Sequence, residues 1–294
     1  MKHTILGAIC LSLAASIWGG MYVVSKYVLD FIPPLTLVWL RFIIAFVVLY
    51  GILKLAEKKQ KKKVTIRKKD WLLFAWIGFI GYFISITCQF IGTKLSDAHT
   101  GSLVTSATPA FMVIFAALIL KEKLTARRLL STVIATIGVI IVIGWDIEIG
   151  SYFIGTIILV GAAITWALLS IYVKIASIQF SSLVITTYAI FFSLFFITPF
   201  MIWELQTSSI GTVNTYVILG VLYLGIVSTA GAFFLWNKGL ELIDASIGSL
   251  FFFFQPIVGS LLGWLLLNET LNSNFFIGGI LIICSVLITT FEKK

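Results

Sequence analysis

The fold is decided by a stretch that occurs twice in the chain. Residues 92–124 read GTKLSDAHTGSLVTSATPAFMVIFAALILKEKL, and residues 239–271 read GLELIDASIGSLFFFFQPIVGSLLGWLLLNETL. The two align without gaps at an offset of 147. An aspartate, a proline and a glutamate match in both copies: Asp97 and Asp244, Pro109 and Pro256, Glu122 and Glu269. Such residues are rare in apolar helices, so their coincidence at one offset indicates a duplicated unit.

The composition excludes a water-soluble globule. Of the 294 residues, 60% are hydrophobic and only 11% are charged, whereas soluble domains carry about 25% charged residues. The class that remains is an all-α polytopic membrane protein. Apolar runs bounded by charged or turn residues predict ten transmembrane helices. Their approximate limits are 5–25, 35–53, 71–91, 98–119, 126–144, 152–173, 182–203, 213–235, 245–267 and 273–291.

The duplication extends upstream, where Trp18 and Lys26 match Trp166 and Lys174 at an offset of 148. The chain is therefore expected to hold two five-helix repeats, residues 1–146 and 147–294. Because five is odd, the second repeat begins on the opposite side of the membrane. Inverted repeats of this kind favour a binding site near the midplane, between the halves. The alternative is that the duplication is only historical, in a receptor, a channel or a structural subunit.

The basic residues predict the orientation of the chain. Of the 21 lysines and arginines, nine follow the second predicted span, in residues 54–69, and four follow the fourth. In all, 18 fall on the side of the N-terminus, which identifies that side as cytoplasmic. Both termini are then cytoplasmic, in a multi-pass protein of the cell membrane. The net charge of +9 reports this orientation and contact with lipid, and no aromatic or folded motif supports nucleic-acid binding.

Other function classes lack their motifs. The three cysteines, Cys10, Cys88 and Cys284, are widely spaced in apolar stretches, so no metal site is expected. The chain has no G-x-x-x-x-G-K-[ST] motif for ATP and no G-x-S-x-G motif of a serine hydrolase. We therefore expect neither an enzyme nor a cofactor.

Several motifs together resemble the EamA-type family of the drug/metabolite transporter superfamily. They are the pattern Ala15, Trp18, Gly19 leading to Lys26, the pair Arg41-Phe42 after Pro34, and the duplicated stretch itself. The resemblance covers essentially the whole chain. It implies a membrane carrier, often an exporter of amino acids, other metabolites or drugs. Ala189 stands in the second repeat where Arg41 stands in the first, so the site is expected to be asymmetric.

Polar and aromatic groups inside spans are the candidates for a substrate cavity, because they are costly in lipid. Arg41 could bind a carboxylate or phosphate of the substrate; alternatively it snorkels to the interface or pairs with a carbonyl or an acid such as Asp30. Lys26 and Lys174 are expected to be interfacial anchors, with gating charges as the alternative. The cavity residues we expect are Trp18, Tyr22, Arg41, Gln89, Thr105, Trp166, Trp236, Asn237, Phe252 and Gln255.

Pro109 and Pro256 are the expected hinges, because a proline removes a backbone donor and occurs here at matching mid-span positions. The alternative is a static kink whose free carbonyl is satisfied by Ser or Thr.

The function we expect is secondary transport, in the direction of export, of a small organic solute by alternating access. A channel or a lipid or amphiphile scramblase is the alternative. No Asp or Glu lies at mid-span, which weakens proton coupling through a buried carboxylate. The sequence does not decide whether transport is coupled to an ion, or whether the protein is a monomer or a homodimer.

Overall fold

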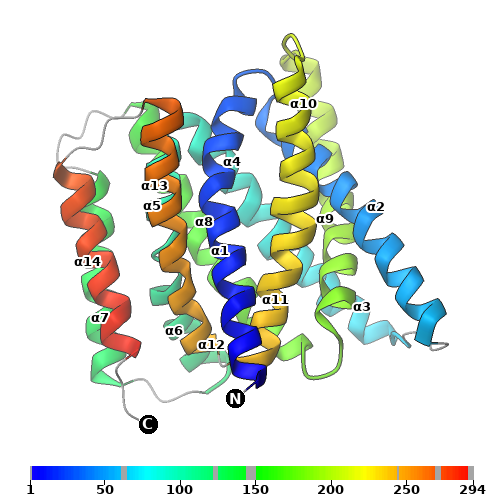
Figure 1. Cartoon of the computed structure of the whole chain (residues 1–294), viewed down its shortest axis with the longest axis horizontal. Helices are drawn as coiled ribbons and strands as arrows, with labels where there is room; N and C mark the ends of the chain where they lie inside the picture. Colours follow the sequence, from blue (N-terminus) through cyan, green and yellow to red (C-terminus); the bar gives the residue numbers. More distant parts are fainter. Residues whose placement is uncertain are drawn as a thin grey trace.

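The computed structural model describes residues 2–60, 65–121, 125–143, 150–243, 245–268 and 273–290. All regular elements in these ranges are helical, and they form one elongated bundle (Figure 1). Three acidic residues of the duplicated stretch, Glu122, Asp244 and Glu269, lie outside the described residues.

Seven stretches are helical, long and apolar enough to cross a membrane, so the chain is a multi-pass membrane protein. They are Ile5–Leu29, Pro34–Lys59, Lys68–Leu95, Thr100–Ile119, Ser151–Ala176, Ser182–Thr207 and Thr215–Leu242. The fifth, ninth and tenth predicted spans correspond to shorter helices of 18, 14 and 18 residues: α7 (Ala126–Ile143), α13 (Phe254–Leu267) and α14 (Ser273–Thr290). Ten crossings therefore remain a prediction.

Of the seven long spans, four are single helices and three are interrupted, as is the predicted ninth span. The single helices are α1 (Lys2–Leu29), α2 (Pro34–Gln60), α8 (Ser151–Ala176) and α9 (Ser182–Thr207). The third span joins α3 (Lys68–Ile77) to α4 (Ile86–Leu95) through the π-helical segment η1 (Gly78–Ser85), and the eighth joins α10 (Thr215–Leu222) to α11 (Ala232–Leu242) through the π-helical segment η2 (Tyr223–Gly231). The two π-helical segments occupy corresponding positions in the repeats. π-Helical turns are frequent at functional sites.

The spans that contain the two prolines are also broken. The fourth consists of α5 (Ala98–Thr105) and α6 (Thr108–Ile119), and the ninth consists of α12 (Ala245–Gly248), the 3-10 segment η3 (Ser249–Phe253) and α13. Pro109 lies in the first turn of α6, where its missing N–H would leave the carbonyl of Thr105 free. The hydroxyl of Thr108 donates to that carbonyl at 2.6 Å, so the break is satisfied locally. That the prolines act as hinges stays a prediction.

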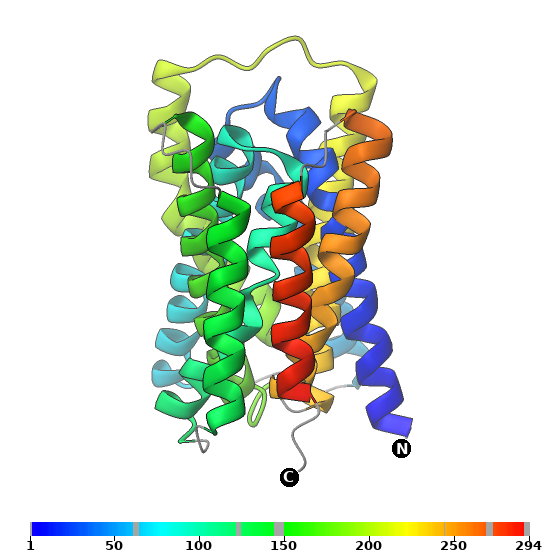
Figure 2. The same cartoon turned by 90° about the vertical axis from the view of Figure 1, so that its left-hand side faces the viewer.

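The centre of the bundle consists of two groups of three helices. The α1 group contains α1 with α11 and α13 packed on it, and the α8 group contains α8 with α4 and α6 packed on it. At the sides, α2 packs against α9, and α7 packs against α14 (Figures 1 and 2). Each central group therefore combines helices from both halves of the sequence.

Glycines allow the same close crossing in both groups. In the α8 group, Gly92 of α4 faces Gly155 of α8, and a Cβ atom on either glycine would lie 2.8 Å from the carbonyl oxygen of the other. In the α1 group, Gly239 of α11 faces Gly7 and Leu11 of α1. Gly92 and Gly239 are 147 apart, and Gly155 and Gly7 are 148 apart, so the two crossings are related by the sequence repeat. Small residues let membrane helices pack at this distance.

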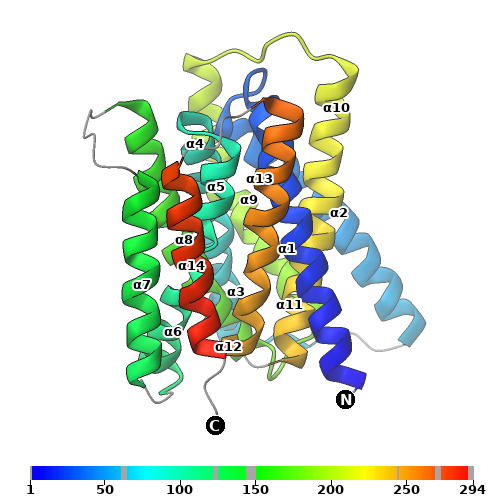
Figure 3. The same ribbon diagram turned by 60° about the vertical axis from the view of Figure 1, so that its left-hand side comes forward.

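Helices α1 and α8 run in opposite directions (Figure 3). The turn after α1 touches the loop after α9, where the N–H of Gly211 donates to the carbonyl of Phe31 at 2.7 Å. Helix α8 leads into α9, whose 26 residues span about 39 Å. The end of α8 therefore lies far from the end of α1, at the opposite end of the bundle.

The crossing of α4 and α8 gives a matched stability test. Gly155→Ala should lower the free energy of unfolding by about 1–3 kcal/mol, because the new methyl group would meet backbone atoms of Gly92 and Ser96. Gly161→Ala, also in α8, meets nothing within 4 Å and should be neutral or stabilise by up to about 1 kcal/mol. Thermal unfolding of the purified variants measures both, and equal losses would contradict the crossing.

Candidate functional site

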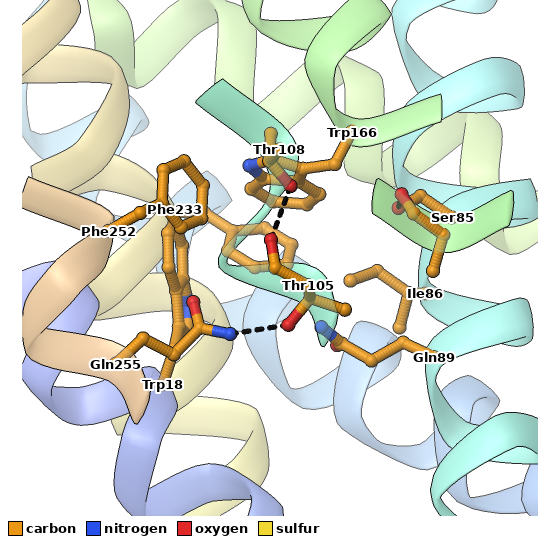
Figure 4. A pocket seen from close by; sticks show the side chains of 11 residues that line it. Trp18, Ser85, Ile86, Gln89, Thr105, Thr108, Trp166, Phe233, Phe252 and Gln255 are labelled. Atoms are coloured by element: carbon orange, nitrogen blue, oxygen red, sulfur yellow. Dashed lines mark hydrogen bonds between the residues drawn. The ribbon is translucent and has the colours of Figure 1, made fainter. Parts of the chain in front are cut away.

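A cavity lies between the α1 group and the α8 group, with about 310 Å³ of space not filled by protein atoms. This space includes the part that is open to solvent, so it is an upper bound on the enclosed volume. The α1 group supplies Trp18, Phe233 and Gln255, with Phe252 from η3 beside them, and the opposite wall is formed mainly by α4 and α8 (Figure 4). The full lining is Trp18, Ser85, Ile86, Gln89, Thr105, Thr108, Ala162, Trp166, Phe233, Phe252 and Gln255.

Aromatic rings form the apolar part of the lining. The ring centroids of Trp18 and Trp166 are 5.2 Å apart in an edge-to-face arrangement, and Trp18 lies 6.1 Å from Phe252 in a stacked one. Phe233 stacks on Tyr82 with centroids 4.7 Å apart. Trp18 and Trp166 come from corresponding positions of the two repeats. The cavity that they line therefore lies where the two repeats meet. Such a lining accommodates the apolar body of an organic solute.

A hydrogen-bonded cluster of four side chains forms the polar part of the site. Gln89, Thr105 and Gln255 line the cavity, and Tyr22 bonds to all three. The hydroxyl of Tyr22 is 2.7 Å from that of Thr105 and accepts from Nε2 of Gln89 and, at 3.3 Å, from Nε2 of Gln255. Gln255 also donates to the hydroxyl of Thr105 at 2.6 Å. The cluster joins α1, α4, α5 and α13, so it connects both groups at the cavity.

Two polar atoms in the lining are buried and have no hydrogen-bond partner among the described residues. They are Nε1 of Trp166, a donor, and Oε1 of Gln89, an acceptor. The repeat mate Trp18 differs, because its Nε1 donates to the carbonyl of Ser228 at 3.1 Å. A buried polar group without a partner is costly, so the cavity offers one donor and one acceptor to a solute.

The structure brings together most, but not all, of the residues expected from the sequence. Trp18, Gln89, Thr105, Trp166, Phe252 and Gln255 line the cavity, and Tyr22 bonds to three of them. Trp236 lies behind the lining, with its ring 5.3 Å from Trp18 and 4.4 Å from Phe252. Asn237 is further away and donates to Tyr82 and Thr186. Their contact with a substrate stays a prediction.

Arg41 lies outside the lining and is fully buried. Its Nε donates to Thr229 at 2.6 Å and its Nη2 to Ser228 at 3.3 Å, both in η2. The guanidinium therefore does not snorkel to the interface. Its hydrogen-bond partners in the described chain are side-chain groups without charge, and Asp30 is not among them.

Five lining residues were absent from the set expected from the sequence: Ser85, Ile86, Thr108, Ala162 and Phe233. Ser85 and Ile86 reach the cavity at the junction of η1 with α4. They were missed because the sequence of an apolar run does not reveal a π-helical turn. Phe233 belongs to an aromatic-rich segment in which no single ring stands out. Only Thr108, beside Pro109, carried a usable signal.

The two repeat-related lysines, Lys26 and Lys174, bind helix ends. Their role as interfacial anchors or as gating charges stays a prediction. Nζ of Lys26 donates to the carbonyls of Thr93, Lys94 and Ser96 at 3.2, 3.1 and 2.6 Å. Nζ of Lys174 donates to the carbonyls of Leu240 and Ile243 at 2.9 and 3.1 Å.

The acceptors of the two lysines are counterparts in the two repeats, because residues 93 and 96 align with residues 240 and 243 at the offset of 147. A cation is stabilised by the unpaired carbonyls at a helix C-terminus. We call these contacts the Lys26 bridge and the Lys174 bridge; each links the α1 group to the α8 group, and they lie at opposite ends of the bundle.

Comparisons with known proteins agree with this geometry. The EamA-like transporter family matches residues 5–144 and 153–291. The uncharacterized transporter YetK of Bacillus subtilis is 28% identical over 97% of this chain and 87% of its own length. A probable amino-acid metabolite efflux pump of Escherichia coli is 26% identical, with 96% of this chain and 94% of the pump covered. A crystal structure at 20% identity shares the fold, with a TM-score of 0.70 over 97% of this chain and 96% of its own.

The two repeat-related tryptophans provide a test of the lining. Trp18→Phe removes a buried hydrogen bond and should lower the free energy of unfolding by about 1 kcal/mol more than Trp166→Phe does. Both variants lose the same volume, so thermal unfolding compares them directly. Equal losses would indicate that Nε1 of Trp166 has a partner of its own in the protein.

Proposed function

Because the chain belongs to the EamA-like transporter family, and is therefore a transporter and not an enzyme, we propose that it is a secondary carrier. It moves a small organic solute across the cytoplasmic membrane by alternating access. In this proposal the chain crosses the membrane ten times, as two inverted five-helix repeats that meet at residues 146 and 147.

The observation that carries the proposal is the pair of lysine bridges around the cavity. The Lys26 bridge ties the α1 group to the α8 group beyond one end of the cavity, and the Lys174 bridge ties them beyond the other. Opening the cavity at either end requires the two groups to separate there and one bridge to break. The other bridge then holds the opposite end closed.

The repeat explains why both openings are accessible. The contacts that must break at one end are the sequence counterparts of those at the other, so the two open states are expected to have similar free energies. A carrier needs such a balance, because a large difference would leave one state unpopulated. Each bridge consists of hydrogen bonds from one charged group, worth about 1.5–3 kcal/mol each, and water that enters the open end can replace the carbonyls as partners of the lysine.

The orientation and the direction of transport are parts of the same proposal. The excess of basic residues on the side of the N-terminus supports cytoplasmic termini. The start of α1 and the end of α14 lie at the same end of the bundle, as an even number of crossings requires (Figure 1). Export of a metabolite is supported by the relatives that are named probable amino-acid metabolite efflux pumps.

A channel or a scramblase is the competing class, and exchange kinetics separate it from a carrier. Proteoliposomes that contain the protein are preloaded with unlabelled amino acids, and uptake of the same labelled mixture is followed. A carrier gives saturable uptake that is faster in preloaded vesicles. Linear flux that ignores the preloaded solute would refute alternating access.

Opposite effects of the two lysines test the bridges without knowledge of the solute. In a cysteine-free background, Ser85→Cys places a reporter thiol in the cavity lining. Lys26→Ala should increase labelling by a membrane-impermeant methanethiosulfonate from one side of the membrane, and Lys174→Ala from the other. We expect a several-fold change in rate, measured in right-side-out and inverted vesicles.

The matched control is Lys54→Ala, which removes a lysine that pairs with Glu57 at 2.8 Å, outside the cavity. This substitution should leave the labelling rate unchanged from both sides. If Lys26→Ala and Lys174→Ala both increased labelling from the same side, the bridges would not be the opposing closures of one cavity.

A further inference from the structure

Arg41 is a buried cation that lacks a counter-ion among the described residues. Its side chain is 0% exposed. The ion pairs in the described part of the chain join Lys54 to Glu57, Arg67 to Asp70 and Lys238 to Glu241. A buried charge without an opposite charge is strongly destabilising, and inside a membrane protein it marks a functional group by default.

The described carboxylates near the helix ends are committed elsewhere. Glu204 accepts the backbone N–H groups of Leu35 and Thr36 at 3.0 and 2.7 Å, and so caps the start of α2. Asp97 caps α5 by accepting the N–H of Thr100 at 2.7 Å. Asp30 is exposed in the turn after α1. Compensation for Arg41 from these side chains would require rebuilding the helix ends.

Neutral groups surround the guanidinium. Besides the hydroxyls of Thr229 and Ser228, Nη1 lies 3.5 Å from the sulfur of Met21. The faces of Phe90 and Phe233 lie 4.8 and 5.7 Å from Cζ. Hydroxyl dipoles and aromatic faces hold the side chain in place, but they offset only part of the cost of burying its charge.

Arg41 is one side chain away from the cavity. Phe233 both contacts Arg41 and lines the cavity. Ser228 links the two as well, because its hydroxyl accepts from Arg41 and its carbonyl accepts from Trp18. At an effective dielectric constant of about 20, a charge still acts across the thickness of one ring, and an anion in the cavity would be favoured by at least about tenfold.

The same place in the second repeat holds no charge. Ala189 replaces Arg41 at an offset of 148, and Tyr82 and Asn237 replace Thr229 and Phe90 at the offset of 147. There Nδ2 of Asn237 donates to Tyr82 at 3.0 Å and to Thr186 at 2.7 Å. The pair of repeats therefore supplies one positive charge to one cavity.

We propose, on the basis of the proposed function, that the transported solute carries a single carboxylate and that Arg41 is its counter-charge. The rings of Trp18, Trp166 and Phe252 take the apolar part of the solute. One buried cation behind the lining matches one negative charge, whereas a phosphate dianion would leave a second charge uncompensated, because the lining itself is neutral. Arg41 thus selects the charge of the solute, and the aromatic rings select its body.

The test uses two probes with the same body, 3-phenylpropionate and the neutral 3-phenylpropanamide. Their apparent Kd values for the purified full-length protein in detergent come from the dependence of Tm on probe concentration. The native protein should bind the propionate at least about tenfold more tightly than the amide. Arg41→Lys, which keeps the charge, should retain the preference, and Arg41→Gln should abolish it.

Stability without a probe separates this role from a structural one. Arg41→Gln removes an uncompensated charge, so its Tm without probe should equal or exceed that of the native protein. Three results would overturn the proposal: no preference in the native protein, including no response to either probe; a preference that survives in Arg41→Gln; or a lower Tm in Arg41→Gln. Binding is measured without transport, so a failed exchange assay would refute the carrier and leave the charge preference to be judged separately.

Discussion

The close crossing of glycines within each central group is the constraint on which the rest of the structure depends. Gly92 meets Gly155 where α4 crosses α8, and Gly239 meets Gly7 where α11 crosses α1. In both cases the third span of one half lies against the first span of the other. The halves of the sequence are therefore interlocked, and the units that face each other across the cavity are the α1 group and the α8 group.

The remaining features follow from that exchange of helices. Trp18 and Trp166 meet inside because each belongs to the first span of its half. Lys26 and Lys174 reach the ends of α4 and α11, and so join the two groups at opposite ends. The symmetry is broken by Arg41 and by Nε1 of Trp166, which lack a counter-ion and a hydrogen-bond partner, respectively, among the residues that the structure describes. A symmetric frame that allows two openings thus surrounds an asymmetric site for one solute.

Much of this could be predicted from the sequence, because apolar length, basic loops and a fixed repeat offset are properties of the chain itself. The helical fold followed from them, the family from the resemblance of several motifs, and most aromatic and polar lining residues from their places inside apolar spans. The lysine bridges were missed because their acceptors are backbone carbonyls, which no residue type reveals. The lining at Ser85 and Ile86 depends on a π-helical turn, and that of Phe233 on which of several adjacent rings faces inward. These depend on tertiary packing and not on local pattern.

The central claim is that the two groups separate at one end while they stay joined at the other. Double electron–electron resonance tests this claim by measuring the distance between two spin labels. One pair of labels is placed at residues 30 and 94, at one end of the bundle, and a second pair at residues 178 and 238, at the other end. Alternating access predicts two distances, one short and one long, for each pair in lipid. Conditions that favour the long distance at one end should favour the short distance at the other. A single unchanged distance at both ends, in a protein that still transports its solute, would contradict the account.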